Sequence, residues 1–322
     1  MKKSTKIWLI VATALTVLGI IISASALALA GFDYRILSQY KCKTTTFEID
    51  EDFDNISIKA DTADITFLPS ENEKAKVVIY EREDYAPSAS VDGSTLKISN
   101  HGELRWYQYI STFDFSDRKI TVYLPRTSYG SLTVDSSTGD VTIPKPFSFG
   151  SLNIELSTGN VKCCASIEKS LKINTSTGNI TLNDLSAGSL DLTVDTGDIT
   201  ASNVTVENSI KINVSTGKTE LSSVTAKTLS TSGSTGDVSL KNIVLSGKLF
   251  IERSTGNVKF DRSDAAEIRI ITDTGDISGS LRSPKIFFVD TDTGDIDVPK
   301  TTTGGKCDIT TDTGDIKITI AK

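Results

Sequence analysis

The stretch Asp312-Thr313-Gly314-Asp315 is the last of ten copies of one four-residue corner, and it decides the fold. In every copy a Thr precedes the glycine, and a Ser or Asp stands directly before that Thr. The glycines recur at a near-constant step of 19 or 20 along the chain, at Gly139, Gly159, Gly178, Gly197, Gly217, Gly236, Gly256, Gly275, Gly294 and Gly314. A unit this short cannot bury its own apolar face. The fixed period therefore predicts that each copy is one turn of a coil stacked on its neighbours.

The residues around each corner alternate between apolar and polar, which is typical of β-strands with one buried face. Apolar pairs stand seven and five residues before the glycine, as Leu190 and Leu192 do, and two and four residues after it, as Ile180 and Leu182 do. A third apolar position follows seven residues after the glycine, at Leu185, Val204, Val224 and Ile243. Each turn should hold two strands around the corner and a short third strand, and successive turns should pair in parallel.

The predicted fold is all-β, a single-stranded parallel β-solenoid (β-helix) of about ten turns that keep the 19–20 step, preceded by one transmembrane helix. We divide the chain into cytoplasmic lysines and membrane anchor (1–32), a stalk (33–43), an irregular β capping section (44–125) and the regular solenoid (126–322). Ala63 takes the glycine place in a degenerate corner upstream of Gly139, at a distance that would fit four periods. The capping section should seal the N-terminal end, because the terminal repeats of such arrays are commonly atypical.

The N-terminal segment has the length and composition of a membrane span. Residues 7–32 carry no charge and follow Lys2, Lys3 and Lys6, so they can cross a bilayer as a helix. Lysines on the short flank predict a cytoplasmic N-terminus and an extracellular body, as a single-pass protein of the cell membrane. A cleaved signal peptide is the alternative, because Ala-x-Ala-like sites end at Ala28 and Ala30. The length of the apolar run favours a retained anchor, and either interpretation places the body outside the cytoplasm.

Charge and cysteine usage exclude several classes of function. The chain has a net charge of −7, and an acidic surface without a basic stripe argues against a nucleic-acid partner. His101 is the single histidine and no Cys-x-x-Cys exists, so a zinc site is not expected. Cys42, Cys163, Cys164 and Cys307 are expected to be free thiols, with Cys163 and Cys307 facing inward.

Asp-Thr-Gly is also the active-site triplet of aspartic proteases, and it occurs at Asp195, Asp273, Asp292 and Asp312. That mechanism needs two carboxylates that face each other and share a proton. Copies of a solenoid turn are related by translation and point the same way, and six sister corners carry Ser in this position. We therefore expect no protease, and no enzyme.

The last three corners carry Asp on both sides of the Thr-Gly pair. The six residues are Asp273, Asp276, Asp292, Asp295, Asp312 and Asp315. Like charges on neighbouring strands destabilise a sheet, so this column faces open water, is held by backbone N–H groups, or binds a cation. Oxygen ligands suit Ca²⁺, which is the one cofactor that the sequence suggests. Solvated carboxylates that cap their own turns are the simpler interpretation.

An aromatic cluster at Trp106, Tyr107 and Tyr109 is a candidate contact for a glycan or a protein partner. The alternative is that these rings plug the open end of the coil.

A single N-terminal membrane segment followed by Ser/Asp-Thr-Gly-Asp/Asn corners about twenty residues apart resembles the bacterial putative adhesin family. This is a group of uncharacterised β-solenoid proteins that includes Lia-type envelope-stress accessory proteins of Gram-positive bacteria. The resemblance covers roughly residues 45–320 and implies a solenoid without catalytic residues.

We therefore expect a non-enzymatic, membrane-anchored extracellular β-solenoid that acts as an adhesin or envelope-binding scaffold. The alternative is an accessory protein in envelope-stress signalling that acts through a protein partner. Expected contacts are the membrane through residues 7–32 and a cell-wall polymer or envelope protein. Weak self-association is also expected through the last turn, where Ile316, Ile318 and Ile320 should form an uncovered edge.

Overall fold

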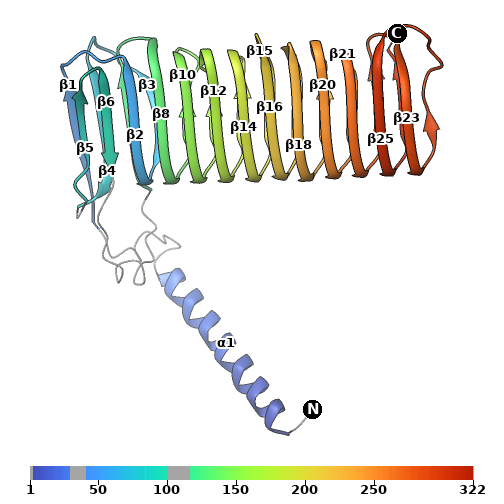
Figure 1. The fold of residues 1–322 in the computed structure, drawn as a ribbon. Helices are drawn as coiled ribbons and strands as arrows, with labels where there is room; N and C mark the ends of the chain where they lie inside the picture. Colours follow the sequence, from blue (N-terminus) through green and yellow to red (C-terminus); the bar gives the residue numbers. More distant parts are fainter. Residues whose placement is uncertain (1–2, 30–40, 84, 101–116, 322) are drawn as a thin grey trace.

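The computed structural model describes residues 3–29, 41–83, 85–100 and 117–321, and it is a parallel β-solenoid of about ten turns preceded by one helix (Figure 1). The solenoid fold is confirmed. His101 and the aromatic cluster of Trp106, Tyr107 and Tyr109 lie outside the described residues. The proposed section boundaries at residues 32, 43 and 125 stay predictions.

Helix α1 (Lys3–Leu29) has the length and composition to cross a membrane. Its segment Thr5–Leu29 is predominantly apolar and packs against no other part of the described chain. Thr13 and Thr16 satisfy their hydroxyls within the helix by donating to the carbonyls of Leu9 and Ala12. The helix therefore exposes no unpaired hydroxyl at these two positions.

The regular part of the solenoid consists of strands that pair with their equivalents one turn away. These are β8 (Ser128–Thr138), β9 (Val141–Ile143), β10 (Ser148–Thr158), β11 (Val161–Cys163), β12 (Ser166–Thr177), β13 (Ile180–Asn183), β14 (Ser186–Thr196), β15 (Ile199–Val206), β16 (Ser209–Thr216), β17 (Thr219–Ala226), β18 (Thr228–Thr235), β19 (Val238–Lys241), β20 (Val244–Thr255), β21 (Val258–Thr274) and β22 (Ile277–Leu281). The register keeps identical positions together, as Leu152 with Leu171 and Ile154 with Ile173. Most inward side chains are aliphatic and buried, and their burial is the main contribution to the stability of such a rod. The predicted third strand is not separate: Val204 lies within β15 and Val224 within β17. The apolar positions predicted for it are buried as expected.

The corner explains the invariant Thr-Gly pair. Gly217 has a φ of 144°, a region that L-residues rarely adopt. A Cβ at this position would lie 1.9 Å from the carbonyl oxygen of Gly197 in the turn below. The Gly217 amide in turn donates to the carbonyl of Thr235 in the turn above, at 2.9 Å. Only glycine allows the stacked backbones to approach this closely.

The N-terminal end is built from β1 (Cys42–Ile49), β2 (Asn55–Thr62), β3 (Asp64–Pro69), β4 (Ala75–Arg82), β5 (Ser88–Asp92), β6 (Thr95–Asn100) and β7 (Lys119–Leu124). The Ala63 corner stacks directly on the first glycine corner, since the Ala63 amide donates to Thr138 O at 2.9 Å. Although the distance along the chain would fit four periods, no further corner lies between those of Ala63 and Gly139 in the stack. Strand β6 pairs with β2, and β7 pairs with β3, on the sides that face away from β8 and β9. Strand β4 runs antiparallel to both β1 and β7.

The last two turns are exchanged in space relative to their order in the chain (Figure 1). Strand β25 (Gly305–Thr313) pairs with β21 on one side and with β23 (Lys285–Thr293) on the other, and β26 (Ile316–Ile320) lies in the same way between β22 and β24 (Ile296–Asp297). The turn formed by β25 and β26 therefore lies between the turn of β21 and β22 and the turn of β23 and β24, although it follows both in the sequence. Ile316 and Ile318 are 0% and 2% exposed, so the prediction that they form the uncovered edge is wrong. The open end is made by β23 and β24.

The four cysteines are free. Cys163 and Cys307 are buried as predicted, and desolvation in the core raises the pKa of both thiols to about 12. These two cysteines fill the core as small apolar side chains.

Candidate functional site

The most regular surface feature is the corner ridge, which we define as the exposed Ser/Asp, Thr and Asp/Asn side chains around the stacked corners from Ala63 to Gly294. The corners align in one file along one edge of the rod (Figure 1). The Thr before each glycine is exposed, as Thr177, Thr196 and Thr235 are. Equivalent hydroxyls therefore recur at the spacing of paired strands, about 4.8 Å.

The residue after each glycine ties successive turns together. Its side-chain oxygen accepts the backbone amide of the equivalent residue in the next turn, as Asp140 Oδ1 accepts from Asn160 N at 2.8 Å and Asn160 Oδ1 accepts from Asn179 N at 3.0 Å. The ladder continues through Asp198, and beyond Lys218 it resumes from Asp237 to Asn257 and Asp276. Only Asp and Asn combine a short side chain with this acceptor, which explains the sequence preference.

The acidic column at the C-terminal end belongs to the same ladder. Asp276 Oδ1 accepts the Asp315 amide at 2.9 Å, and Asp315 Oδ1 accepts the Asp295 amide at 2.8 Å. Two of the six aspartates proposed for calcium are therefore engaged by backbone N–H groups. The partners on the other side of the glycine, Asp273, Asp292 and Asp312, are exposed to solvent.

Within the described residues no group of three or more His, Cys, Asp or Glu side chains is arranged to hold a metal ion. Calcium binding by this column stays a prediction. The aspartates of the Asp-Thr-Gly triplets follow one another along one edge, because Thr274 pairs with Thr313 and Thr313 with Thr293 in parallel register. That arrangement offers no facing carboxylate pair of the kind a protease needs.

The ladder is interrupted at Lys218. Its amide donates to Asp198 Oδ1 at 2.7 Å, but an ammonium group has no acceptor for the Asp237 amide. A shallow groove of about 360 Å³ opens beside this interruption, with the long side chains of Glu220 and Lys259 on either side of the short Ser239. Its lining is polar and of mixed charge, so it suits a hydroxylated ligand better than an apolar one.

A buried arginine crosses the core behind the ridge, and the periodicity did not predict it. Arg253 is 1% exposed. Its guanidinium donates to Val214 O at 3.0 Å and to the hydroxyls of Thr219 and Thr231 at 2.9 and 3.1 Å. Desolvation lowers its pKa.

The sequence does carry a signal for this arginine, because its partners break the apolar pattern. Thr219 and Thr231 stand at inward positions where other turns have Val, Ile or Leu. Gly233 stands in the same inward file as Arg253, one turn away. A Cβ on Gly233 would lie 1.7 Å from Arg253 Nη1, so the glycine provides the space for the guanidinium.

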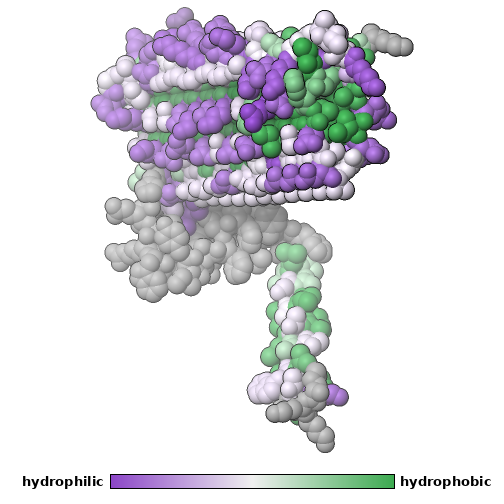
Figure 2. Space-filling model, turned by 45° about the vertical axis from the view of Figure 1, so that its right-hand side comes forward, coloured by the Kyte–Doolittle hydropathy of each residue, from purple (hydrophilic) through white to green (hydrophobic). Residues whose placement is uncertain are grey.

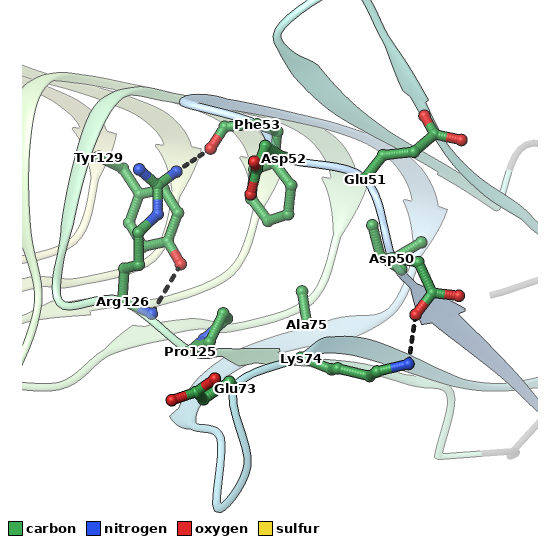
Figure 3. Close-up of a pocket in the computed structure, with 11 residues that line it drawn as sticks. Asp50, Glu51, Asp52, Phe53, Glu73, Lys74, Ala75, Pro125, Arg126 and Tyr129 are labelled. Atoms are coloured by element: carbon green, nitrogen blue, oxygen red, sulfur yellow. Dashed lines mark hydrogen bonds and ion pairs between the residues drawn. The ribbon is translucent and has the colours of Figure 1, made fainter.

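A second cavity, of about 320 Å³, lies at the N-terminal end where three loops meet (Figure 3). The Arg126 guanidinium lies 4.8 Å from the centre of the Tyr129 ring and donates to Phe53 O. Lys74 forms an ion pair with Asp50 at its mouth. Phe53, Tyr129 and Phe149 stack in succession, with ring centroids 5.7 and 6.1 Å apart. These rings join the cavity floor to the solenoid core.

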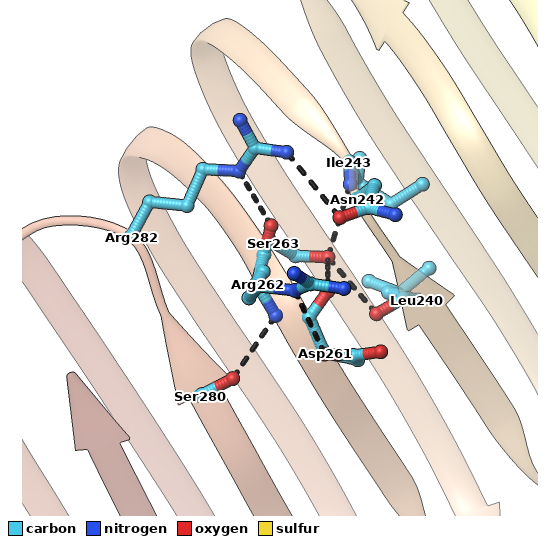
Figure 4. Close-up of polar contacts among 8 residues, drawn as sticks. All are labelled: Leu240, Asn242, Ile243, Asp261, Arg262, Ser263, Ser280 and Arg282. Atoms are coloured by element: carbon cyan, nitrogen blue, oxygen red, sulfur yellow. Dashed lines mark hydrogen bonds and ion pairs between the residues drawn. The ribbon is translucent and has the colours of Figure 1, made fainter. Parts of the chain in front are cut away.

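The looser corner on the opposite edge is held by side chains from neighbouring turns (Figure 4). Asn242 and Arg262 adopt a positive φ there. Arg282 reaches back to donate from Nε to Arg262 O at 2.6 Å, and Ser263 Oγ donates to Leu240 O at 2.9 Å. These contacts hold neighbouring turns together. They differ from turn to turn, so the regular repetition of exposed groups is a feature of the corner ridge.

The fold and this ridge define the protein as a parallel β-solenoid with a stacked polar corner, following a helix that could span a membrane. The Toastrack DUF4097 family matches the chain over residues 53–255 and 207–322, and the chain belongs to that family. The resemblance to uncharacterised bacterial β-solenoid proteins is thereby confirmed.

Solved structures with a similar fold share little sequence with this chain. One is titled a putative lipid binding protein from Parabacteroides distasonis, with 16% identity and a TM-score of 0.49, covering 88% of this chain and 98% of the other. Others are titled putative adhesins, one from Bacteroides fragilis (15% identity, TM-score 0.43, 87% and 97% covered) and one from Parabacteroides distasonis (13%, 0.43, 88% and 98%). Among curated proteins no match is found.

Proposed function

We propose that this protein is a non-enzymatic scaffold, anchored in the cell membrane by α1 and displayed outside the cell, that binds an extended envelope polymer along its corner ridge. The observation that supports this proposal is the ridge itself. It presents the same hydroxyl, amide and carboxylate groups turn after turn on a rod whose backbone is hydrogen-bonded on both sides. A polymer of repeating polar units can meet equivalent groups at a constant step, and the many weak contacts add up.

The placement of the body follows from the N-terminal sequence. The three lysines before the uncharged residues 7–32 favour a cytoplasmic N-terminus, so the solenoid would lie on the opposite side of the membrane. Protease added to intact cells should then degrade the solenoid and leave a fragment that contains α1 in the membrane. Release of the whole solenoid from washed cells would instead support a cleaved signal peptide.

Binding is tested with the full-length protein in nanodiscs and purified cell-wall polysaccharide, by co-sedimentation. The ridge variant Ser176→Lys/Ser234→Lys adds two bulky side chains to exposed corner positions. The control Ser186→Lys/Thr225→Lys adds the same charge to exposed positions away from the ridge that are two turns apart. We expect the ridge variant to lose most of the retention and the control to keep it. Equal retention of both variants, or no retention of the unaltered protein, would refute the ridge as a polymer-binding surface and favour an accessory role with a protein partner.

A further inference from the structure

We infer that the C-terminal end of the solenoid is a self-association surface, at which the β23 strands of two copies pair antiparallel about a twofold axis at Phe288. The end face is defined here as β23 and β24, residues 285–297. It contains none of the Ser-Thr-Gly corners altered in the polymer-binding test, so the two proposals can fail independently.

The first observation is an unpaired strand edge. In the described part of the chain β23 pairs with β25 alone and β24 pairs with β26 alone. Figure 1 shows β23 at the C-terminal end of the rod, next to β25. A free edge presents a row of unpaired N–H and C=O groups and is a template for another strand. Pro284 and Pro299 bracket this edge, and since proline cannot donate to a ladder they limit any pairing to the residues between them.

The second observation is that the edge is apolar on both faces. Phe288, Ile286 and Ile296 are 53%, 38% and 45% exposed. Phe287 and Val289, which pack against the core, are only partly buried because no further turn covers them. Figure 2 turns this end toward the viewer and shows a hydrophobic area where the rest of the visible rod is largely polar.

The outward file to which Phe288 belongs is otherwise polar in the adjoining turns. The residue beside Phe288 is Asp308, and the next is Arg269. An outward phenylalanine on this uncovered strand therefore does not follow the pattern of a solvent-exposed face. Apolar groups of this size at an open edge favour contact with a matching surface.

The residues of β23 favour a second copy as the occupant. In an antiparallel pair centred on Phe288, Phe287 lies opposite Val289 of the second copy, which is a stabilising aromatic and β-branched pair. Phe288 meets its own equivalent, and Asp290 lies opposite Ile286. Lys306 lies beside Ile286 in the adjacent strand. Its ammonium group lies 5.2 Å from the centre of the Phe288 ring and 2.8 Å from Asp308 Oδ2, and it adds positive charge to the edge that Asp290 of the second copy meets.

The alternative, parallel pairing, is disfavoured by charge. It would place Asp290 and Asp292 beside their own equivalents, and like charges directly opposite destabilise a sheet. An antiparallel pair also obeys twofold symmetry, which closes the assembly. The surface should therefore produce dimers joined end to end, and no fibres.

Disulfide trapping tests the register. In the full-length protein in detergent micelles, with Cys42→Ser and Cys164→Ser to remove the two partly exposed thiols, Phe288→Cys should give a covalent dimer on mild oxidation. The matched variant Asp292→Cys stands four residues from the axis, so its two copies would be separated by eight residues, about 26 Å. A disulfide needs Cα atoms within about 7 Å, and Asp292→Cys should stay monomeric on a non-reducing gel.

A second measurement guards against association through α1. Phe288→Asp adds a charge to an exposed position, so the fold should persist by circular dichroism while the dimer fraction in light scattering falls at least tenfold. Equal trapping of Phe288→Cys and Asp292→Cys, or a dimer fraction unchanged by Phe288→Asp, would overturn the inference.

Discussion

Replacing Lys218 with asparagine should stabilise the solenoid, because it would complete the corner ladder. Each intact step of the ladder is one hydrogen bond of 2.7–3.0 Å from a backbone amide to an Asp or Asn side chain. One such bond contributes about 0.5–1.5 kcal/mol net, and its exposure places it toward the lower end. With the Oδ1 atom of the introduced asparagine accepting from the Asp237 amide, we expect a gain of about 0.5–1 kcal/mol. For a body of this size that corresponds to a rise in Tm of about 1–3 °C.

The assay is thermal unfolding of the full-length protein in micelles, followed by circular dichroism. Lys218→Ala is the matched control, since it removes the same ammonium group and supplies no acceptor. Asn160→Ala tests the opposite sign, because it removes the acceptor of the Asn179 amide and should lower stability by a similar amount. If Lys218→Asn melts no higher than Lys218→Ala, the side-chain ladder adds nothing to the stability that the backbone already provides.

Three further outcomes follow from the structure. Gly217→Ala should cost several kcal/mol and greatly reduce the yield of folded protein, because its Cβ would lie 1.9 Å from a carbonyl oxygen, whereas Gly93→Ala, in open space with a φ of 60°, should cost about 1–2 kcal/mol by urea unfolding. Arg253→Ala should cost about 3–4 kcal/mol, because it leaves a cavity and unpaired hydroxyls on Thr219 and Thr231, and Arg253→Met should recover the part due to the cavity. Burial raises the pKa of the Cys163 and Cys307 thiols to about 12. A thiol reagent at pH 8 should therefore react with two of the four cysteines in the folded protein and with all four after denaturation. The folded state keeps these protons while the unfolded state loses them near pH 8.5, so this contribution to stability should be lost as pH rises from about 8.5 to 12.

The architecture could be predicted from the sequence because its cause is local. A residue such as Gly217, with a positive φ and close to the carbonyl of the preceding turn, tolerates no side chain, so the requirement is visible at every repeat. The inward positions were likewise visible, since burial of one strand face imposes a period of two. Even the unusual places of Cys163 and Cys307 followed from their offset to the corner.

The order of the turns could not be predicted, because it depends on pairing between backbones. Every rung offers nearly the same N–H and C=O edges, so the period identifies turns without saying which rung lies beside which. The Ala63 corner therefore stacks directly on Gly139 despite the long segment between them, and the Gly314 turn lies between those of Gly275 and Gly294.

The candidate site was only partly accessible to sequence reasoning. The polar ridge was foreseen as a column of carboxylates, but the hydrogen bonds that hold Asp276 and Asp315 run between turns and need the register. The Arg253 network was missed because a solitary Arg at an inward position contradicts the binary pattern. It becomes intelligible only with Gly233 and the two threonines placed around it.

The exchange of the last two turns also determines what kind of edge the protein exposes. Had the turns stacked in chain order, β25 and β26 would form the outermost rung, and β23 and β24 would be paired on both sides. Instead β25 and β26 are paired on both sides, and the exposed β23–β24 rung is tethered by connections at both of its ends. Such a rung cannot peel away as a free terminus. Its unpaired groups are held in the extended geometry that a second strand requires, and this preorganisation lowers the entropy lost on binding. The same exchange therefore leaves a tethered, apolar edge available for pairing.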